Sequence, residues 1–315
     1  VLFGFLLVYI ICSAWVLHLF DILFISIWFR LNIAAVIFFC LSILRYYKWY
    51  DFEFGILKKY NVQSILLGGI IIFWVLVSLI RIGEMPTLSN DALTMHLMQQ
   101  LTFFQEGKFN FHPSNTWESA FRPLNGIIWN MFFSTFFEDT DLIEVPQLIS
   151  WVGLIIFTIG IFRLLEIHKS LSIISIFCIA FSPIILSLSI SNNIDLVTLF
   201  ILSGIIYFIF IIEKSSDTSL LNIILFGIFC GALLGVRMQG VILVPLFFIY
   251  YCFILKSKNK ISWISILIPI FITITLGSGK YIMNFFNYGF PFPLGINETN
   301  SISLFNFKIN FLYNF

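Results

Sequence analysis

Residues 194–212 read IDLVTLFILSGIIYFIFII, an apolar run whose one charged residue is Asp195 near its start. With a rise of 1.5 Å per residue, a helix of this length covers about 28 Å, close to the thickness of the hydrocarbon core of a bilayer. The run does not alternate apolar and polar residues, as a strand of a membrane barrel would. We therefore predict a transmembrane helix.

The composition extends this prediction to the whole chain. Of its 315 residues, 60% are hydrophobic and 10% are charged, whereas charged residues make up about 25% of a typical soluble domain. The apolar runs predict nine spans, near residues 2–17, 22–44, 63–81, 145–162, 170–190, 195–212, 220–236, 239–255 and 262–278. We expect an all-α, polytopic membrane protein of about nine transmembrane helices.

Positive charges in the loops predict the orientation, because cytoplasmic loops retain Lys and Arg. One set of alternate loops holds ten of them: Arg45, Lys48, Lys58, Lys59, Arg163, Lys169, Lys214, Lys256, Lys258 and Lys260. The opposite set holds six over far more residues: Arg81, Lys108, Arg122, Arg237, Lys280 and Lys308. The first set is therefore predicted to be cytoplasmic.

This orientation divides the chain into four parts. Residues 1–81 carry N-terminal transmembrane helices, and residues 82–144 form a large extracytoplasmic first loop with interfacial helices. Residues 145–279 form a transmembrane bundle, and residues 280–315 form an extracytoplasmic segment. The chain starts with Val and ends on FKINFLYNF, which is compatible with a fragment that lacks C-terminal helices.

The stretch LSNDALTMHL, residues 88–97, opens the large loop. The residues that follow Asp91 place Leu97, Leu101 and Phe104 on one stripe and Gln99, Gln100 and Thr102 away from it, which predicts an amphipathic helix along the membrane surface. Asp91 would lie in the first turn of this helix, where the helix dipole favours a carboxylate. Two interpretations follow, a helix cap and a catalytic acid.

Arg237 lies in the join between two predicted spans, within GALLGVRMQGVILVP at residues 231–245. The join falls on the predicted outer side, where positive charge is disfavoured. An Arg at this depth can bind a lipid phosphate through a bidentate fork, or it can reach the headgroups of bulk lipid. Lys280, at the outer end of the last predicted span, offers a second cation on the same face.

The other candidate polar residues have simpler alternatives. Asp195 opens a span and could act as an N-cap, and Glu118 and Arg122 have the spacing of an ion pair on one helix face. His96 and His112 lack the spacing of metal ligands and are expected at an interface or in the core. The apolar but interrupted segment 121–136 is predicted to be interfacial.

Neither a metal nor a nucleic-acid partner is indicated by the sequence. The five cysteines all fall inside apolar runs, without CxxC spacing: Cys12, Cys40, Cys178, Cys230 and Cys252. The net charge is +1, and no Lys or Arg block resembles a nucleic-acid-binding tail. We expect no cofactor, and a requirement for a divalent metal stays open.

Several segments together resemble membrane glycosyltransferases of the GT-C superfamily, especially bacterial enzymes similar to protein O-mannosyltransferases and the lipid A aminoarabinose transferase. NDALTMHL at residues 90–97 resembles the acidic motif of the first loop in that family. Four further segments match in order: FRPLNGIIWNMFFSTFF at 121–137, SNNIDLVTLFIL at 191–202, GALLGVRMQG at 231–240, and KYIMNFFNYGFPFPLG at 280–295.

The resemblance implies the transfer of a sugar from a polyprenyl-phosphate carrier to an acceptor hydroxyl of a lipid, glycan or protein at the extracytoplasmic face. It implies that Asp91 is the general base and that Arg237, helped by Lys280, binds the phosphate of the donor. The segment that starts at Lys280 adds Tyr281 and Asn284 to the candidate substrate-binding residues, with His96, Glu118, Arg122 and Asp195. The expected location is the bacterial inner membrane.

Two other classes of protein remain as alternatives. In a non-catalytic lipid-binding scaffold, Asp91 would cap a helix and Arg237 would bind headgroups. A secondary transporter would place acids or broken helices at the middle of the membrane. The interiors of the predicted spans contain almost no charges apart from Arg30, with Asp21 just before the same span. The transporter is the least favoured of the three.

Overall fold

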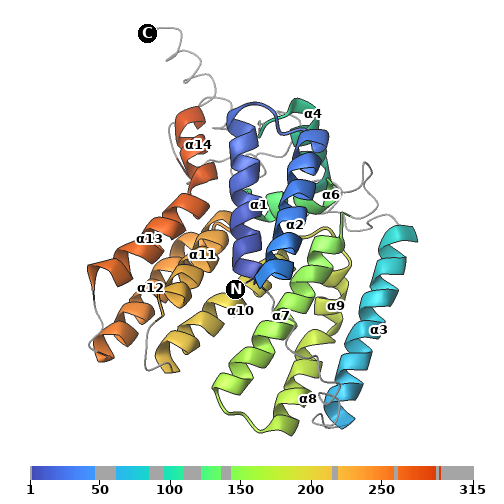
Figure 1. The fold of residues 1–315 in the computed structure, drawn as a ribbon, viewed down its shortest axis with the longest axis vertical. Helices are drawn as coiled ribbons and strands as arrows, with labels where there is room; N and C mark the ends of the chain where they lie inside the picture. The colour runs from blue at the N-terminus through green and yellow to red at the C-terminus, as the bar shows by residue number, and fades with distance from the viewer. Residues whose placement is uncertain are drawn as a thin grey trace, which may run out of the picture.

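The protein is helical throughout the part of the chain that the computed structural model describes. The described residues are 2–46, 62–84, 96–109, 122–135, 143–214, 219–258, 262–288 and residue 291. These ranges contain no strand, and their helices are α1 (Leu2–Leu19), α2 (Ile25–Tyr46), α3 (Val62–Glu84), α4 (Met98–Glu106), α6 (Asn125–Ser134), α7 (Val145–Leu164), α8 (Lys169–Ala180), α9 (Pro183–Ser189), α10 (Asp195–Lys214), α11 (Leu220–Val236), α12 (Gly240–Ser257), α13 (Trp263–Gly277) and α14 (Gly279–Tyr288) (Figure 1).

The predicted all-helical membrane architecture is confirmed, but the count of nine spans is not. Among the described residues, five helices are long and apolar enough to cross a membrane: α1, α3, α7, α10 and α12. The number rises to seven if the bent pairs α8–α9 and α13–α14 each form one span. Each of the nine predicted segments nevertheless coincides with a helix or with the α8–α9 pair.

The predicted span at 170–190 is interrupted at Pro183. α8 and α9 meet at an angle of 59°, and Ser182, which precedes the proline, is extended. Proline disfavours helical backbone in the residue before it and has no N–H to donate. One apolar run therefore forms two helices.

Helix α11 lies at the centre of the bundle and packs against α10, α12 and α13. Gly227 and Gly231 lie one turn apart on its face toward α13. A Cβ atom built on Gly227 would lie 2.8 Å from Cα of Pro269, and one on Gly231 would lie 3.1 Å from Cα of Thr273. These glycines allow the two helices to approach closely, as small residues do between membrane helices.

Helices α1 and α2 form a hairpin at one end of the molecule. Figure 1 shows them displaced along its long axis toward α4 and α14, whereas α3, α7 and α8 reach the opposite end. Tyr9 donates a hydrogen bond to Asn32 Oδ1 (3.0 Å), and Asn32 Nδ2 donates to Thr135 Oγ1 after α6 (2.8 Å). These contacts join the hairpin to α6, a placement that the hydropathy of the sequence does not predict.

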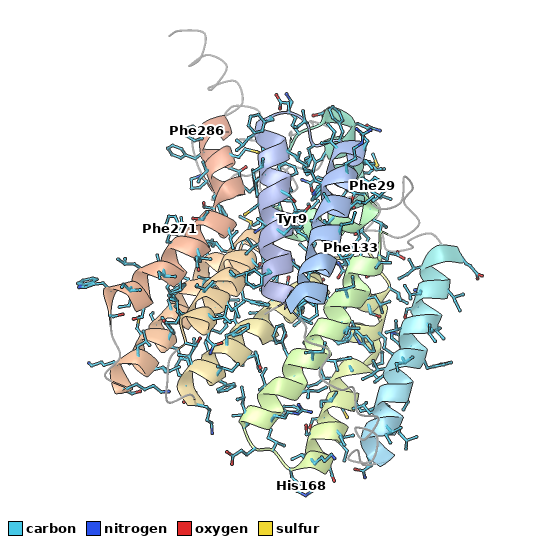
Figure 2. All side chains as sticks on the ribbon, in the orientation of Figure 1. Tyr9, Phe29, Phe133, His168, Phe271 and Phe286 are labelled. Atoms are coloured by element: carbon cyan, nitrogen blue, oxygen red, sulfur yellow. The ribbon has the colours of Figure 1, made fainter. Side chains whose placement is uncertain are left out.

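The exposed apolar side chains fit a protein surrounded by lipid. Figure 2 shows Phe271 of α13 and Phe286 of α14 on the outside of the bundle. They are 71% and 74% exposed, respectively. Large apolar patches of this kind are rare on soluble monomers and mark contact with membranes or partners. The protein is therefore an integral membrane protein.

Two helices of the predicted large loop, α4 and α6, pack against other parts of the protein. Gln99 and Gln100 of α4, expected away from the apolar stripe, are only 4% and 1% exposed, and Phe103 lies on the same buried face. The segment expected to be interfacial at 121–136 contains α6, nearly all of whose residues are buried. α1, α7 and α11 cover α6, and α4 contributes to the buried amides described below. The expectation that Gln99 and Gln100 point away from the protein is therefore wrong, whereas the interfacial position of the two helices stays a prediction.

The orientation of the chain can be tested by cysteine labelling. In a variant whose native cysteines are replaced, Gln105→Cys on the exposed side of α4 should react with an impermeant maleimide in intact cells. Ser257→Cys, at the exposed end of α12, should react only after permeabilisation. The reverse pattern would reject the predicted orientation, since the positive-inside distribution places these positions on opposite faces.

Candidate active site

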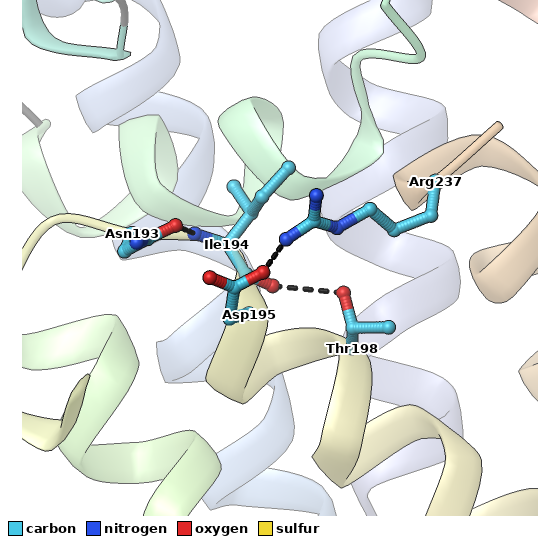
Figure 3. Close-up of polar contacts among 5 residues, drawn as sticks. All are labelled: Asn193, Ile194, Asp195, Thr198 and Arg237. Carbon is cyan, nitrogen blue, oxygen red and sulfur yellow. Dashed lines mark hydrogen bonds and ion pairs between the residues drawn. The ribbon is translucent and has the colours of Figure 1, made fainter. Parts of the chain in front are cut away.

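The candidate site is built around an ion pair between Arg237 and Asp195 (Figure 3). Asp195 is the first residue of α10, and Arg237 lies between α11 and α12 with an extended backbone. Their side chains are 44% and 28% exposed, respectively. A carboxylate in the first turn of a helix is favoured by the helix dipole. Residues far apart in the sequence therefore meet where α10 begins and α11 ends.

The local backbone fixes the position of Asp195. Asn193 Oδ1 accepts a hydrogen bond from the N–H of Ile194 (2.8 Å), and Thr198 Oγ1 donates to the carbonyl of Ile194 (2.9 Å) (Figure 3). Side-chain contacts of this kind stabilise the turn before a helix. The polar sequence SNNID thus orients the carboxylate before α10 begins.

A second guanidinium group acts on the same site. Burial and the positive charge of Arg122 lower the pKa of Arg237. Burial and a like charge both disfavour the charged form of a base, although a guanidinium stays protonated at physiological pH. Arg122 precedes α6 and is partly exposed. Of the predicted residues, Asp195 and Arg237 therefore form an ion pair, and Arg122 lies close enough to influence the charge of Arg237.

Lys280 lies in the first turn of α14 and is 3% exposed. Its neighbour Tyr281 donates a hydrogen bond from its hydroxyl to the carbonyl of Leu234 (2.9 Å), and Asn125 Nδ2 donates to the carbonyl of Leu276 (2.9 Å). The first bond joins α14 to the end of α11 that leads to Arg237, and the second joins α13 to α6. Within the described ranges, no carboxylate forms an ion pair with Lys280.

The remaining predicted residues have varied positions. Tyr281 is 7% exposed, so its side chain acts in packing between α14 and α11. Asn284 is fully buried and donates to the carbonyl of Pro291 (3.3 Å). His96 is 3% exposed and precedes α4. Asp91 and Glu118 lie outside the described residues.

Sequence reasoning missed a cluster of four buried amides, which we call the amide network: Gln100, Asn130, Gln147 and Asn192. Asn192 Oδ1 accepts hydrogen bonds from Asn130 Nδ2 (2.7 Å) and Gln100 Nε2 (3.4 Å), and Asn130 Oδ1 accepts from Gln147 Nε2 (2.8 Å). All four are at most 1% exposed. The network joins α4, α6 and α7 to the turn that leads to Asp195.

Three atoms of the amide network have no hydrogen-bond partner among the described residues. They are Gln100 Oε1, Gln147 Oε1 and Asn192 Nδ2. Buried polar atoms are usually paired, and a hydroxyl group or a water molecule, which both donates and accepts, would satisfy atoms of this kind. A signal for this network exists in the sequence, because Asn130 interrupts the otherwise apolar run GIIWNMFF.

Replacing Asn192 with Leu should destabilise the protein. The variant removes the shared acceptor and leaves the amide donors of Gln100 and Asn130 buried without it, at a cost of about 2–4 kcal/mol. Thermal unfolding in detergent would show this loss. Thr158→Val is the control, because Thr158 is buried but donates only within α7, to the carbonyl of Leu154 (2.8 Å). Equal effects of both variants would contradict a stabilising role of the network.

No metal centre is found in the part of the chain that the structure describes. No group of three or more His, Cys, Asp and Glu residues there is placed to hold a metal ion.

The fold and the site define a helical membrane protein with a cationic site at one end of its bundle. Residues 123–277 match the family model described as dolichyl-phosphate-mannose-protein mannosyltransferase. The match confirms the resemblance to GT-C membrane glycosyltransferases that the sequence motifs indicate. No curated protein and no solved structure gives a significant match. The matched residues include Asp195 and Arg237 but neither Asp91 nor Lys280.

Proposed function

We propose that this protein moves a sugar from a polyprenyl-phosphate-linked donor to an acceptor hydroxyl at the extracytoplasmic face of the membrane. The observation that carries the proposal is the position of Arg237, which pairs with Asp195 at the end of α11 and lies within the residues that match a mannosyltransferase family. A sugar attached to a lipid phosphate reacts at membrane depth, so its phosphate needs a cation there.

Arg237 is proposed to bind the phosphate of the donor. Its ion pair with Asp195 engages one nitrogen, Nη2. A guanidinium carries five N–H donors in a planar fork, so one carboxylate contact still leaves donors for phosphate oxygens. When the bond to the sugar breaks, the leaving phosphate gains negative charge, and a fixed cation stabilises that charge more strongly in the transition state than before it.

Asp91 is proposed to accept the proton of the attacking hydroxyl as it forms the new glycosidic bond. A carboxylate positioned at the reacting group contributes typically about a hundredfold to ten-thousandfold as a general base. Lys280 is proposed as a second cation for the phosphate. Its burial supports the idea, because a buried ammonium group without a paired carboxylate is stabilised by a bound anion.

The test is a transfer assay with membranes that contain the protein. Membranes are incubated with radiolabelled polyprenyl-phosphate sugars, and the label is followed into lipid, glycan and protein fractions. Transfer that depends on the protein supports the proposal and identifies the acceptor. Binding of the donor without transfer to any fraction would contradict it.

The second candidate is a non-catalytic scaffold that binds lipid headgroups. One observation favours it: Arg237 already has an acidic partner in Asp195, as an arginine with a structural role would. The two functions differ in the assay above, since a scaffold would bind the labelled donor and leave it intact.

A further inference from the structure

A groove lies between α3, α7 and α8, near the loop that joins α7 to α8. Its volume is about 390 Å³, and its lining includes Leu67 and Gly68 of α3, Phe162 and Arg163 of α7, and Lys169 and Ile173 of α8. A second groove of about 320 Å³ shares Leu67 and Ile173 with it. The two grooves therefore lie on either side of one contact between α3 and α8.

The groove lies beside a helix, α3, most of whose residues other helices leave uncovered. α3 packs mainly against α7 and α8. Most of its residues are exposed, and only 17% of its most apolar 18-residue segment is buried. A Cβ atom built on Gly68 would meet nothing within 4 Å. An apolar groove that opens beside exposed apolar helix faces lies within reach of lipid chains.

Two cations line the groove at its polar end. Arg163 lies in the last turn of α7 and Lys169 is the first residue of α8; His168, labelled in Figure 2, lies in the loop between them. Glu166 is in the same loop, yet among the described residues neither cation forms an ion pair with it or with another carboxylate. The positive-inside distribution places this loop on the cytoplasmic side.

We infer that the groove binds an acyl chain of an anionic phospholipid of the cytoplasmic leaflet, whose phosphate lies between Arg163 and Lys169. Apolar walls suit the chain, and two cations at the polar end suit a headgroup with net negative charge. The lining of the groove, beside the loop between α7 and α8, contains neither Arg237 nor Asp195. It does not depend on the proposed transferase function.

Competition between two lipids tests this inference. The purified protein in nonionic detergent is incubated with equal amounts of phosphatidylglycerol and phosphatidylcholine with identical acyl chains, and native mass spectrometry counts the lipids retained. The protein should retain phosphatidylglycerol about tenfold better, because each nearby cation favours an anionic lipid severalfold. The double variant Arg163→Gln/Lys169→Gln should retain both lipids equally. Gly68→Leu should lower the retention of both, because its side chain enters the groove.

Matched controls separate the groove from general membrane affinity. Lys214→Gln/Lys256→Gln removes two exposed cations on the same predicted face, outside the groove. Gly69→Leu adds the same side chain at a neighbouring glycine that also has open space but does not line the groove. Both controls should behave like the parent. Equal retention of the two lipids by the parent, or effects of the controls as large as those of the groove variants, would overturn the inference.

Discussion

Replacing Asp91 with Asn is expected to lower the rate of sugar transfer about a hundredfold or more, the usual effect of losing a general base. Asn has nearly the size of Asp and is an equally good N-cap. The variant therefore removes the proton acceptor and keeps the capping ability. Single-turnover transfer from a labelled polyprenyl-phosphate sugar measures the chemical step separately from binding of the donor.

Binding of the donor and folding are the controls for this variant. The affinity for the donor should change little, because the phosphate is proposed to be bound by Arg237 and Lys280. Thermal unfolding should match the parent. If the Asn variant is folded and transfers sugar near the parental rate, Asp91 is a helix cap, and Asp195 and Glu118 become the next candidates for the base. If the variant fails to fold, Asp91 has a structural role.

Hydropathy predicted the helices well because membrane spans are encoded locally. The run at 195–212 became α10, Asp195–Lys214, and the runs at 145–162 and 220–236 became α7 and α11. A continuous apolar segment in lipid must pair its own backbone groups, which a helix does without partners from elsewhere in the chain. The number of spans is harder to predict from local hydropathy, because it depends on breaks in the helices such as the one at Pro183.

The failed predictions concern polar residues on helices. Gln100 and Asn130 have side chains that can face solvent or pair with other amides in a core, and single-helix patterns do not distinguish these cases. Their burial is decided by Gln147 and Asn192, which come from other parts of the chain. The displaced position of the α1–α2 hairpin was not predicted for the same reason, since the hairpin contacts residues near α6 that are distant in sequence.

In the candidate site, too, the local sequence identified single residues but not the contacts between distant segments. Asp195 and Arg237 were each selected from the sequence, one at the start of a span and the other as a cation on the unfavoured side. Their ion pair was not predicted, because nothing in either segment specifies the other as its partner. Arg237 therefore has two roles to separate by experiment, its ion pair with Asp195 and the proposed binding of phosphate.

Replacing Arg237 with Ala is expected to weaken binding of the donor about a hundredfold. Charge-assisted hydrogen bonds contribute about 1.5–3 kcal/mol each, and a phosphate fork contains two. Arg237→Lys should keep part of the affinity, since the charge remains while the planar fork is lost. Equilibrium binding of a labelled polyprenyl-phosphate sugar to the purified protein measures both variants.

Asp195→Asn separates phosphate binding from the ion pair. This variant also breaks the pair, but it leaves the guanidinium in place, so the affinity for the donor should stay near or above the parental value. If the pair is merely structural, Arg237→Ala and Asp195→Asn should destabilise the protein similarly and neither should act selectively on the donor. The pair is partly exposed, and such pairs contribute only about 0–1 kcal/mol to stability. A large and selective loss of donor binding in Arg237→Ala alone therefore cannot arise from the loss of the pair, and it would assign the phosphate to Arg237.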